Sequence, residues 1–154
     1  MVERASQAEI AFQDELWIGQ TVAGETEWTQ ILGLEALPFP ERTPEDVDVT
    51  HMQSPGRTRE TVPGLMPVAD ASVEKQYWPT DPGDVLLEEL AGLTESGTSE
   101  DVLIEFLIEG GARRTYRGRI NSYTPSSTVA EKRMATLSMS IFDRQTTNLR
   151  VVTP

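Results

Sequence analysis

The segment from Thr43 to Trp78 constrains the fold of this chain most strongly, because it contains two strand patterns separated by a long polar stretch. Residues 45–50 alternate between β-branched and charged side chains, with Val47 and Val49 on one side. Residues 68–78 alternate in the same way. Period-two alternation is typical of strands with one buried face. We therefore predict a strand on each side of the polar stretch.

The polar stretch itself, residues 51–67, contains three prolines and two glycines and shows no periodicity. A loop of this length is uncommon in a compact domain unless it is functional. We predict that residues 51–66 form an interaction loop, mobile in the free chain and ordered by contact with a neighbour. The side chains expected to make this contact are His51, Arg57, Arg59 and Leu65.

The length and composition favour one domain. With 154 residues the chain can bury a sizeable core, and we expect residues 1–154 to fold as a single unit. No apolar run approaches the length of a membrane span, and we expect neither membrane insertion nor a signal peptide. The absence of cysteine excludes disulfides, thiolate metal sites and cysteine nucleophiles. These features fit synthesis in the cytoplasm.

The charge is distributed unevenly along the chain, whose formal net charge is −12. Residues 1–50 contain 11 acidic and 2 basic side chains, whereas residues 101–154 contain 5 acidic and 8 basic ones. One interpretation is simply an acidic soluble protein. The other is head-to-tail association, in which the acidic part of one copy meets the basic part of the next.

Apolar periodicity elsewhere predicts further strands and one helix. The helix is expected at residues 82–91, where Thr80 or Asp81 can cap it, Pro82 suits its first position and Gly92 can end it. Strands are expected at residues 9–19, 28–37, 102–109, 112–123, 134–142 and 149–152. Many short strands with one helix indicate a mainly β fold, a β-sandwich or barrel with one flanking α-helix and a long interaction loop.

The hairpin around Gly110-Gly111 has two possible registers. A two-residue loop would place Arg113 beside Ile108 and mix charge into the apolar face. A three-residue loop pairs Glu105 with Arg117 instead and gathers the apolar side chains on the opposite face. Because register follows the hydrophobic pattern, we predict the three-residue loop.

No set of residues has the spacing of a catalytic or metal site. His51 is the single histidine, and no ligand cluster surrounds it in the sequence. There is neither a nucleophile elbow nor a phosphate-binding glycine loop. Arg113, Arg114, Arg117 and Arg119 could form a nucleic-acid patch, but the chain is strongly acidic overall, which disfavours specific binding. We expect no catalytic residue, no metal and no cofactor, and therefore a structural role.

Six motifs follow one another in an order and spacing found in a known family. They are VDVTH at 47–51, SPGR at 54–57, PGL at 63–65, DASV at 70–73, YRGRINSYT at 116–124 and ATLSMSI at 135–141. Together with their surroundings they extend over roughly residues 10–145. This pattern resembles the tail tube (major tail) proteins of long-tailed phages and of gene transfer agents.

The resemblance implies a subunit that forms rings, usually hexameric, which stack into the tube through which DNA leaves the particle. It implies contacts with further copies of the chain and with tape-measure, terminator and baseplate proteins. It also implies a transient, non-specific passage of double-stranded DNA. The expected location is the tail of a virion or phage-like particle.

The resemblance further implies that the strands at 45–50 and 68–77 form part of the inner barrel of the tube. Their apolar rows would then turn toward the helix and the core, where Val47, Val49, Ala71 and Val73 would be buried. Alternation would send their polar side chains to the channel. The predicted channel-facing residues are Asp46, Asp48, Asp70, Ser72 and Glu74, with Thr136, Ser138 and Ser140 extending the wall. Such a wall would repel the phosphates of DNA and let the duplex slide. We expect Glu105 and Glu109 to neutralise the arginines of residues 113–119, or that face to lie at a subunit contact.

Two other classes of protein stay open on the sequence alone. One is another structural component with a similar sandwich, such as a decoration or baseplate protein, or a tube of a contractile tail or type VI secretion system. The other is an enzyme on a jelly-roll scaffold, in which the His51→Ala change would abolish activity. Negative-stain electron microscopy of the purified protein separates a tube protein from a decoration protein, a baseplate protein or an enzyme, because only a tube protein forms rings or tubes.

Overall fold

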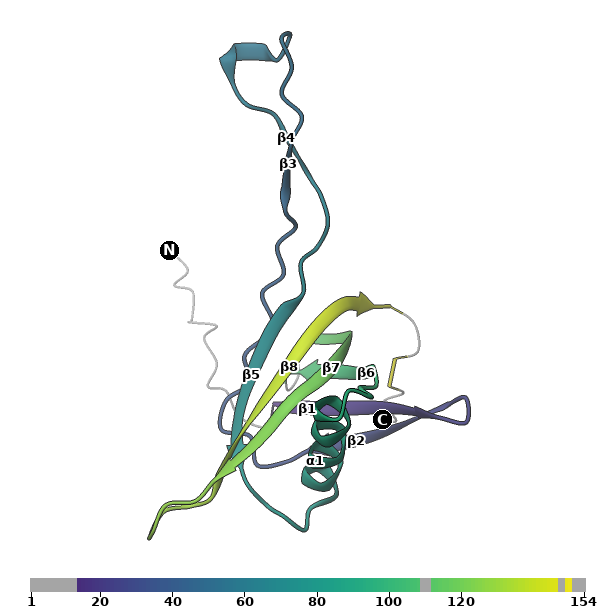
Figure 1. Cartoon of the computed structure of the whole chain (residues 1–154), viewed down its shortest axis with the longest axis vertical. Helices are drawn as coiled ribbons and strands as arrows, with labels where there is room; N and C mark the ends of the chain where they lie inside the picture. The colour runs from purple at the N-terminus through teal and green to yellow at the C-terminus, as the bar shows by residue number, and fades with distance from the viewer. Residues whose placement is uncertain (1–13, 109–111, 147–148, 151–154) are drawn as a thin grey trace, which may run out of the picture.

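The computed structural model describes residues 14–108, 112–146 and 149–150. Its main sheet has six antiparallel strands in the order β2-β1-β6-β7-β8-β5, and two further strands, β3 and β4, pair only with each other. The strands are β1 (Glu15–Val22), β2 (Glu25–Ile31), β3 (Asp46–Asp48), β4 (Thr61–Pro63), β5 (Ala69–Gln76), β6 (Val102–Leu107), β7 (Arg113–Ser126) and β8 (Met134–Gln145). One α-helix, α1 (Pro82–Glu95), lies against one face of the sheet (Figure 1). The prediction of a mainly β fold with one flanking helix is confirmed.

The core lies on the side of the sheet that faces α1. Alternate residues of each strand point into it, as the sequence pattern predicts. Its members on the strands include Leu16, Ile18, Ala71, Val73, Val102, Ile104, Phe106, Ile120, Leu137, Met139 and Ile141. Helix α1 adds Leu87 and Leu90, and Phe39 closes the other end of the core by packing its ring 5.5 Å from that of Phe106.

The helix begins as predicted and ends later. Asp81 is its N-cap and accepts a hydrogen bond from the backbone N–H of Gly83, and Pro82 occupies the first turn. The expected end at Gly92 is wrong, because the helix continues to Glu95. Leu90 is buried and Leu93 packs against the core, so the apolar stripe that holds the helix on the sheet continues past Gly92. Tertiary packing therefore outweighs the weak helix propensity of glycine.

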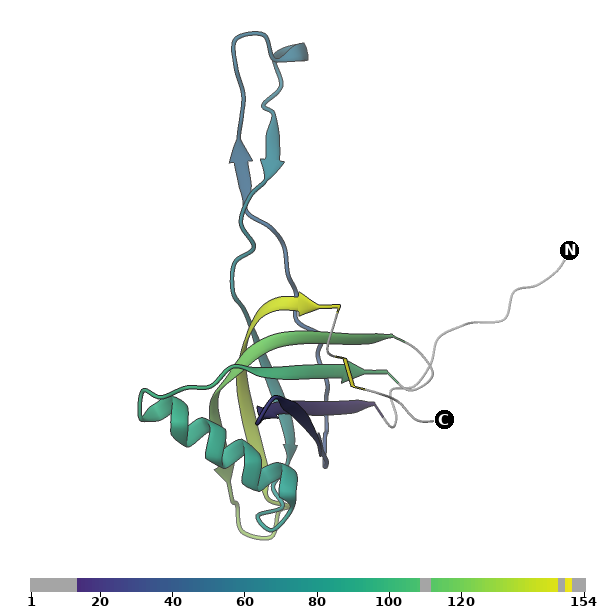
Figure 2. The ribbon, with the colours of Figure 1, turned by 90° about the vertical axis from the view of Figure 1, so that its right-hand side faces the viewer.

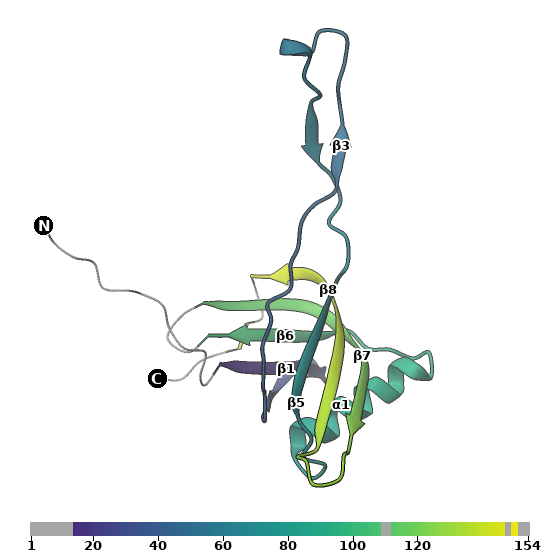
Figure 3. The same ribbon diagram turned by 90° about the vertical axis from the view of Figure 1, so that its left-hand side faces the viewer.

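Strands β7 and β8 are long and bend sharply, so that β5 and β8 cross the direction of β1 and β6 (Figure 3). The register between them shifts twice, which leaves Phe142 of β8 and Asn121 of β7 without direct partners. Such bulges increase the twist and bend of a strand pair. Gly118 lies between the two shifts, and a Cβ atom added there would lie 2.5 Å from the Ser140 carbonyl oxygen. Only glycine permits this close approach at the bend.

The register predicted for the hairpin of β6 and β7 is wrong by two residues. Glu105 lies opposite Thr115 rather than Arg117, and Leu107 lies opposite Arg113. A shift of two residues keeps every side chain on its predicted face, because the side-chain period of a strand is two. The hydrophobic pattern could therefore select the faces but not the register. The loop residues 109–111, including Glu109, lie outside the described residues.

The strand predicted at residues 45–50 forms, but it does not join the main sheet. As β3 it pairs with β4, with Val47 opposite Val62. Val47 and Val49 are 47% and 42% exposed, so the prediction that they are buried is wrong. The expected strand at 28–37 is shorter, since β2 ends at Ile31. Most of the residues of the predicted strand at 149–152 lie outside the described part of the chain.

Candidate functional site

Residues 45–66 form a slender projection, called here the arm, which extends away from the sheet before β5 begins (Figures 1 and 2). The short ladder of β3 and β4 is continued by backbone hydrogen bonds from Glu45 N to Leu65 O and from Val49 N to Glu60 O, at 3.0 and 2.9 Å. No residue of the arm is buried. The arm therefore contributes nothing to the core, and its shape is maintained by contacts within the arm.

The tip of the arm is a compact polar turn. The short 3₁₀ helix η1 (Pro55–Arg57) forms its end. The hydroxyl of Ser54 donates to the Glu60 carboxylate at 2.8 Å and accepts from the His51 backbone N–H at 3.0 Å. His51 Nε2 lies 3.4 Å from Glu60 Oε2, and its Nδ1 accepts from the Gln53 backbone N–H. The only histidine of the chain thus has a structural role in this turn.

The four residues predicted to contact a neighbour all lie on the arm. Leu65 is 83% exposed at its base, and His51 and Arg57 lie at its tip. Arg59 is exposed but makes an ion pair within the arm, with its guanidinium nitrogen 3.6 Å from Asp48 Oδ2. Hydrogen bonds from the backbone N–H and the side chain of Thr50 lower the pKa of the Asp48 carboxyl.

Apolar side chains are exposed along the arm as well. Val47 and Val62 form a cross-strand pair, and Met52 near the tip is 95% exposed. Exposed apolar side chains in series mark an interaction surface more often than single ones do. This exposed row was not predicted from the sequence, because Val47 and Val49 were expected to be buried in the core.

The outer face, defined as the side of β5, β7 and β8 that points away from α1, is polar. Asp70, Ser72 and Glu74 are exposed on β5, and the register places them opposite Ser140, Ser138 and Thr136 of β8. The two predicted groups of polar residues therefore lie side by side, although Ser140 itself is buried and Ser138 is half-buried. Ser140 links them further, because it accepts from Asn121 Nδ2 at 2.7 Å and donates to Asp70 Oδ1 at 3.4 Å.

Asp46 and Asp48 do not belong to this surface. They lie on β3, in the separate two-stranded ladder, and not beside Asp70 in the main sheet. Asp46 and Asp48 were predicted to share a wall with Asp70 because residues 45–50 and 68–77 alternate in the same way. Period-two alternation defines which side chains share a face of one strand, but not which strands pair.

The arginines of β7 are paired in several ways. Arg117 bridges Asp101 and Asp143 at 2.6 and 2.7 Å, and these hydrogen bonds raise the pKa of its guanidinium. Arg113 binds the buried carboxylate of Glu105, as the sequence analysis expected of that glutamate. The Arg119 guanidinium has no carboxylate partner among the described residues; its Nε donates to the side-chain oxygen of Asn121.

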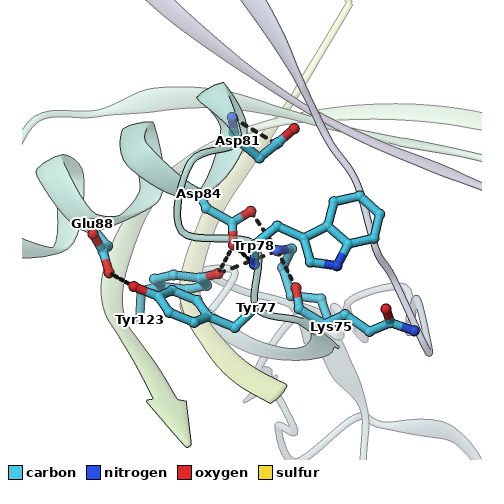
Figure 4. A network of polar contacts seen from close by, with 9 residues as sticks. Lys75, Tyr77, Trp78, Asp81, Asp84, Glu88 and Tyr123 are labelled. Atoms are coloured by element: carbon cyan, nitrogen blue, oxygen red, sulfur yellow. Dashed lines mark hydrogen bonds and ion pairs between the residues drawn. The ribbon is translucent and has the colours of Figure 1, made fainter. Parts of the chain in front are cut away.

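A buried polar network joins α1 to the sheet (Figure 4). Lys75 Nζ lies 2.6 Å from Asp84 Oδ1, and both side chains are excluded from solvent. Lys75 also donates to the Gln76 carbonyl oxygen, at 2.7 Å. Asp84 Oδ2 accepts from the Tyr123 hydroxyl at 2.7 Å and from the Trp78 backbone N–H at 2.8 Å. The ion pair is therefore surrounded by satisfied hydrogen bonds.

The sequence pattern did contain a signal for this network. Lys75 occupies the inward position of β5, in the row of Ala71 and Val73, and an inward lysine needs a partner. Burial and the hydrogen bond to Asp84 raise the pKa of the Tyr123 hydroxyl well above its usual range. Beyond it, Tyr77 donates to Glu88 at 2.7 Å, which raises the pKa of Tyr77. The network fixes the helix and leaves no group free for chemistry.

In the described part of the chain no group of three or more His, Cys, Asp or Glu side chains could hold a metal ion. Within the same residues no helix is long and apolar enough to cross a membrane. The arm and the outer face are the two exposed surfaces from which a function can be inferred.

Comparison with protein families identifies the class of protein to which this chain belongs. The model of the lambda phage tail tube protein family matches residues 17–148. Because this match covers most of the chain, the protein belongs to the tail tube family, and it is a tail tube subunit. Comparison with curated proteins gives no significant match.

Solved structures share the fold. The tail of an empty gene transfer agent particle, refined with C6 symmetry, has a chain 23% identical with a TM-score of 0.60, covering 82% of this chain and 90% of its own. A chain in the baseplate of the anti-feeding prophage is 12% identical with a TM-score of 0.63, covering 92% of this chain and 96% of its own. The SPP1 tail tube is 12% identical with a TM-score of 0.55, covering 84% of this chain and 74% of its own.

Proposed function

We propose that this subunit assembles with copies of itself into hexameric rings, which stack into a tube that conducts DNA out of a phage or phage-like particle. The observation that supports this most is the arm: an ordered ladder with exposed valines and no buried residue. Such a segment gains free energy only by contact with another molecule. The C6 symmetry of the similar gene transfer agent tail is the basis for the ring number.

In this proposal the arm contacts a neighbouring copy through its exposed side chains. His51, Arg57, Arg59 and Leu65 are the contact residues, with the valine row of β3 and β4 between them. In the same proposal residues 1–154 form a single domain, whose interaction loop at about 51–66 is the outer part of the arm. A heterologous contact of this kind generates rings and open stacks rather than closed dimers.

The outer face is proposed to line the channel. Asp70, Ser72 and Glu74 would face DNA together with the hydroxyl groups of β8. A negative or neutral polar wall does not bind phosphates and so does not retard the duplex. The channel position of Asp46 and Asp48 remains a prediction, and it now requires the arm of some copy to reach the lumen.

The same proposal covers the partners and the chemistry. Tape-measure, terminator and baseplate proteins are the expected neighbours at the ends and inside the tube, and the particle tail is the location. The subunit is not an enzyme in this proposal, because the family it belongs to is one of tail tube proteins. The similar chain of the anti-feeding prophage belongs to a baseplate, so a baseplate role is the second candidate.

Electron microscopy of the purified protein tests the assembly. Rings or tubes are expected, and the change Arg57→Glu with Arg59→Glu should abolish them while circular dichroism stays native. As a matched control, Glu89→Lys with Glu95→Lys reverses two exposed charges on α1 and should leave tubes intact. Monodisperse monomers of the native protein under all conditions would contradict the proposal.

Hydrogen exchange tests the contact of the arm separately. Amides of residues 51–66 should exchange rapidly in the free subunit and slowly in the tube, because the free arm is stabilised only by local hydrogen bonds. Equal protection in both forms would show that the arm contacts nothing on assembly.

The channel assignment is tested by changing Asp70 and Glu74 to lysine. Tubes should still form, and DNA release from the particle should slow, because lysines would bind the passing phosphates. The α1 variant Glu89→Lys with Glu95→Lys carries the same charge change and should release DNA at the native rate. A tube structure with Asp70 and Glu74 outside the lumen would refute the assignment.

A further inference from the structure

Glu105 is a buried carboxylate on the side of the sheet opposite α1. It lies between Ile104 and Phe106, which point into the core, so its side chain points to the other side. Its cross-strand neighbours on that side are Trp17 of β1 and Thr115 of β7. Glu105 is nevertheless 0% exposed. Another segment of the chain therefore covers Glu105 on this side of the sheet.

The cover is the C-terminal segment at residues 149–150, drawn in yellow beside β6 (Figure 2). Arg150 donates to Glu105 Oε1 from both Nε and a terminal nitrogen, at 3.0 and 2.9 Å. Its guanidinium carbon lies 4.1 Å from the centroid of the Trp17 ring. The Arg113 guanidinium donates to the backbone oxygen of Arg150. The side chain of Arg150 is only 13% exposed.

These contacts form a built receptor for one planar cation. A carboxylate that accepts two hydrogen bonds from one guanidinium, together with an aromatic wall against its flat face, matches arginine and not lysine. A guanidinium stacked on tryptophan adds a cation–π attraction. We propose that Glu105 and Trp17 form a guanidinium-binding site whose occupant is Arg150, and that this site fastens the C-terminal segment across β1, β6 and β7.

The site can release its occupant without leaving a buried charge unpaired. Arg113 Nε binds the other carboxylate oxygen of Glu105, at 2.9 Å, and stays in place if Arg150 leaves. Breaking a buried pair is very unfavourable only when one charge is left alone. The indole N–H of Trp17 and the hydroxyl of Thr115 are buried without a hydrogen-bond partner among the described residues. Opening would hydrate both groups, which offsets part of the lost contact energy.

The proposal divides this side of the sheet into two parts. Asp70, Ser72 and Glu74 on β5 are open to solvent, whereas Glu105 on β6 and the Trp17 ring on β1 lie against Arg150. The inference does not depend on tube formation, because every group in the site belongs to one chain.

The occupant is tested with Trp17 as the reporter. The chain has three tryptophans, so Trp28→Phe with Trp78→Phe leaves Trp17 alone. In this background Arg150→Ala should make Trp17 fluorescence several-fold more sensitive to acrylamide quenching, while thermal unfolding stays cooperative. Arg150→Lys should give an intermediate value, because lysine keeps the charge but loses the fork. Unchanged quenching in Arg150→Ala would overturn the proposal.

The site itself is tested by chemical rescue. Methylguanidinium chloride, at concentrations too low to denature, should restore the protection of Trp17 in Arg150→Ala along a saturable curve. Methylammonium chloride at equal ionic strength should not restore it, and neither cation should act on Arg150→Ala with Glu105→Gln. Equal effects of the two cations would show general screening and would contradict a guanidinium site.

Discussion

The arm and the six-stranded sheet with α1, called here the body, contain the same kind of strand. They differ in what covers that strand. Val47 on the arm and Val73 in the sheet both belong to alternating patterns, yet they are 47% and 0% exposed. Helix α1 and the segment around Phe39 cover the apolar row of the body, whereas no part of the chain that the structure describes covers that of the arm. Alternation thus predicts which side chains share a face, and a second layer decides whether that face is buried.

The two regions should also differ in how they unfold. An isolated two-stranded hairpin is marginally stable in water, while several strands packed under a helix unfold together. The body should therefore carry the cooperative stability of the subunit, and the arm should carry its capacity to bind copies of itself. Four predictions test this division, from the largest expected effect on stability to the smallest.

The change Lys75→Met should be the most destabilising. It leaves Asp84 buried with its hydrogen bonds from Trp78 and Tyr123 but without a cation. Removing one partner of a buried ion pair costs about 3–5 kcal/mol, measurable by urea unfolding. Lys75→Met with Asp84→Leu should recover part of the loss, because neither charge then remains. A single variant as stable as the native chain would show that the network does not fix the helix.

The change Val73→Ala should be intermediate, and Val47→Ala is its matched control. Deleting buried methyl groups leaves a cavity, so Val73→Ala should lose roughly 2 kcal/mol. Val47→Ala removes the same groups from an exposed site and should stay within about 0.5 kcal/mol of the native value. Equal losses would mean that the arm folds as part of the cooperative unit.

The sequence predicted the body much better than the arm. The helix start at Asp81 and Pro82, the inward rows of β5 and β8 and the polar outer row at Asp70 all depend on local pattern. The pairing of β3 with β4 depends on which partner is within reach, and no local pattern encodes this. The two-residue error in the β6–β7 register has the same origin, since both registers keep the faces.

Of the candidate site, the sequence predicted that Asp70, Ser72 and Glu74 share one polar face, whereas the channel and contact roles stay predictions. It did not predict two buried ion pairs. The Glu105–Arg150 pair joins positions 45 residues apart, and the Lys75–Asp84 pair joins a strand to a helix. Such pairs become visible only when the elements are packed. An inward lysine in an apolar row is the one signal that sequence reasoning could have used.

Alkaline pH should weaken the body and leave the arm unaffected. The pKa of Tyr123 is raised in the folded protein above its ordinary value of about 10, so the folded state binds more protons above that pH. The stabilising contribution of the protonated hydroxyl is therefore complete below about pH 10 and is lost as the pH rises further. Urea unfolding across this range should show it.

Tyr123→Phe separates this effect from general alkaline denaturation. At neutral pH the variant should be about 1–3 kcal/mol less stable, because Asp84 loses a buried hydrogen bond. Above pH 10 its stability should fall less steeply than that of the native chain. Identical slopes would mean that another group controls the alkaline transition.

The smallest effect on stability is expected from exchanging the charges of the ion pair within the arm. Arg59 and Asp48 are both well exposed, and exposed pairs contribute little to stability. Asp48→Arg with Arg59→Asp keeps the pair and should leave the unfolding midpoint unchanged.

The effect of this exchange on tube assembly is the informative part. If the pair acts only within the arm, the exchanged protein should form tubes as well as the native one does. If Arg59 contacts a carboxylate of another copy, the exchange places an aspartate there and should block polymerisation as strongly as Arg59→Glu alone. We expect the second result, because no residue of the arm is buried against the body and both charged side chains are exposed to a neighbour. Electron microscopy of the exchanged protein beside Arg59→Glu distinguishes the two outcomes.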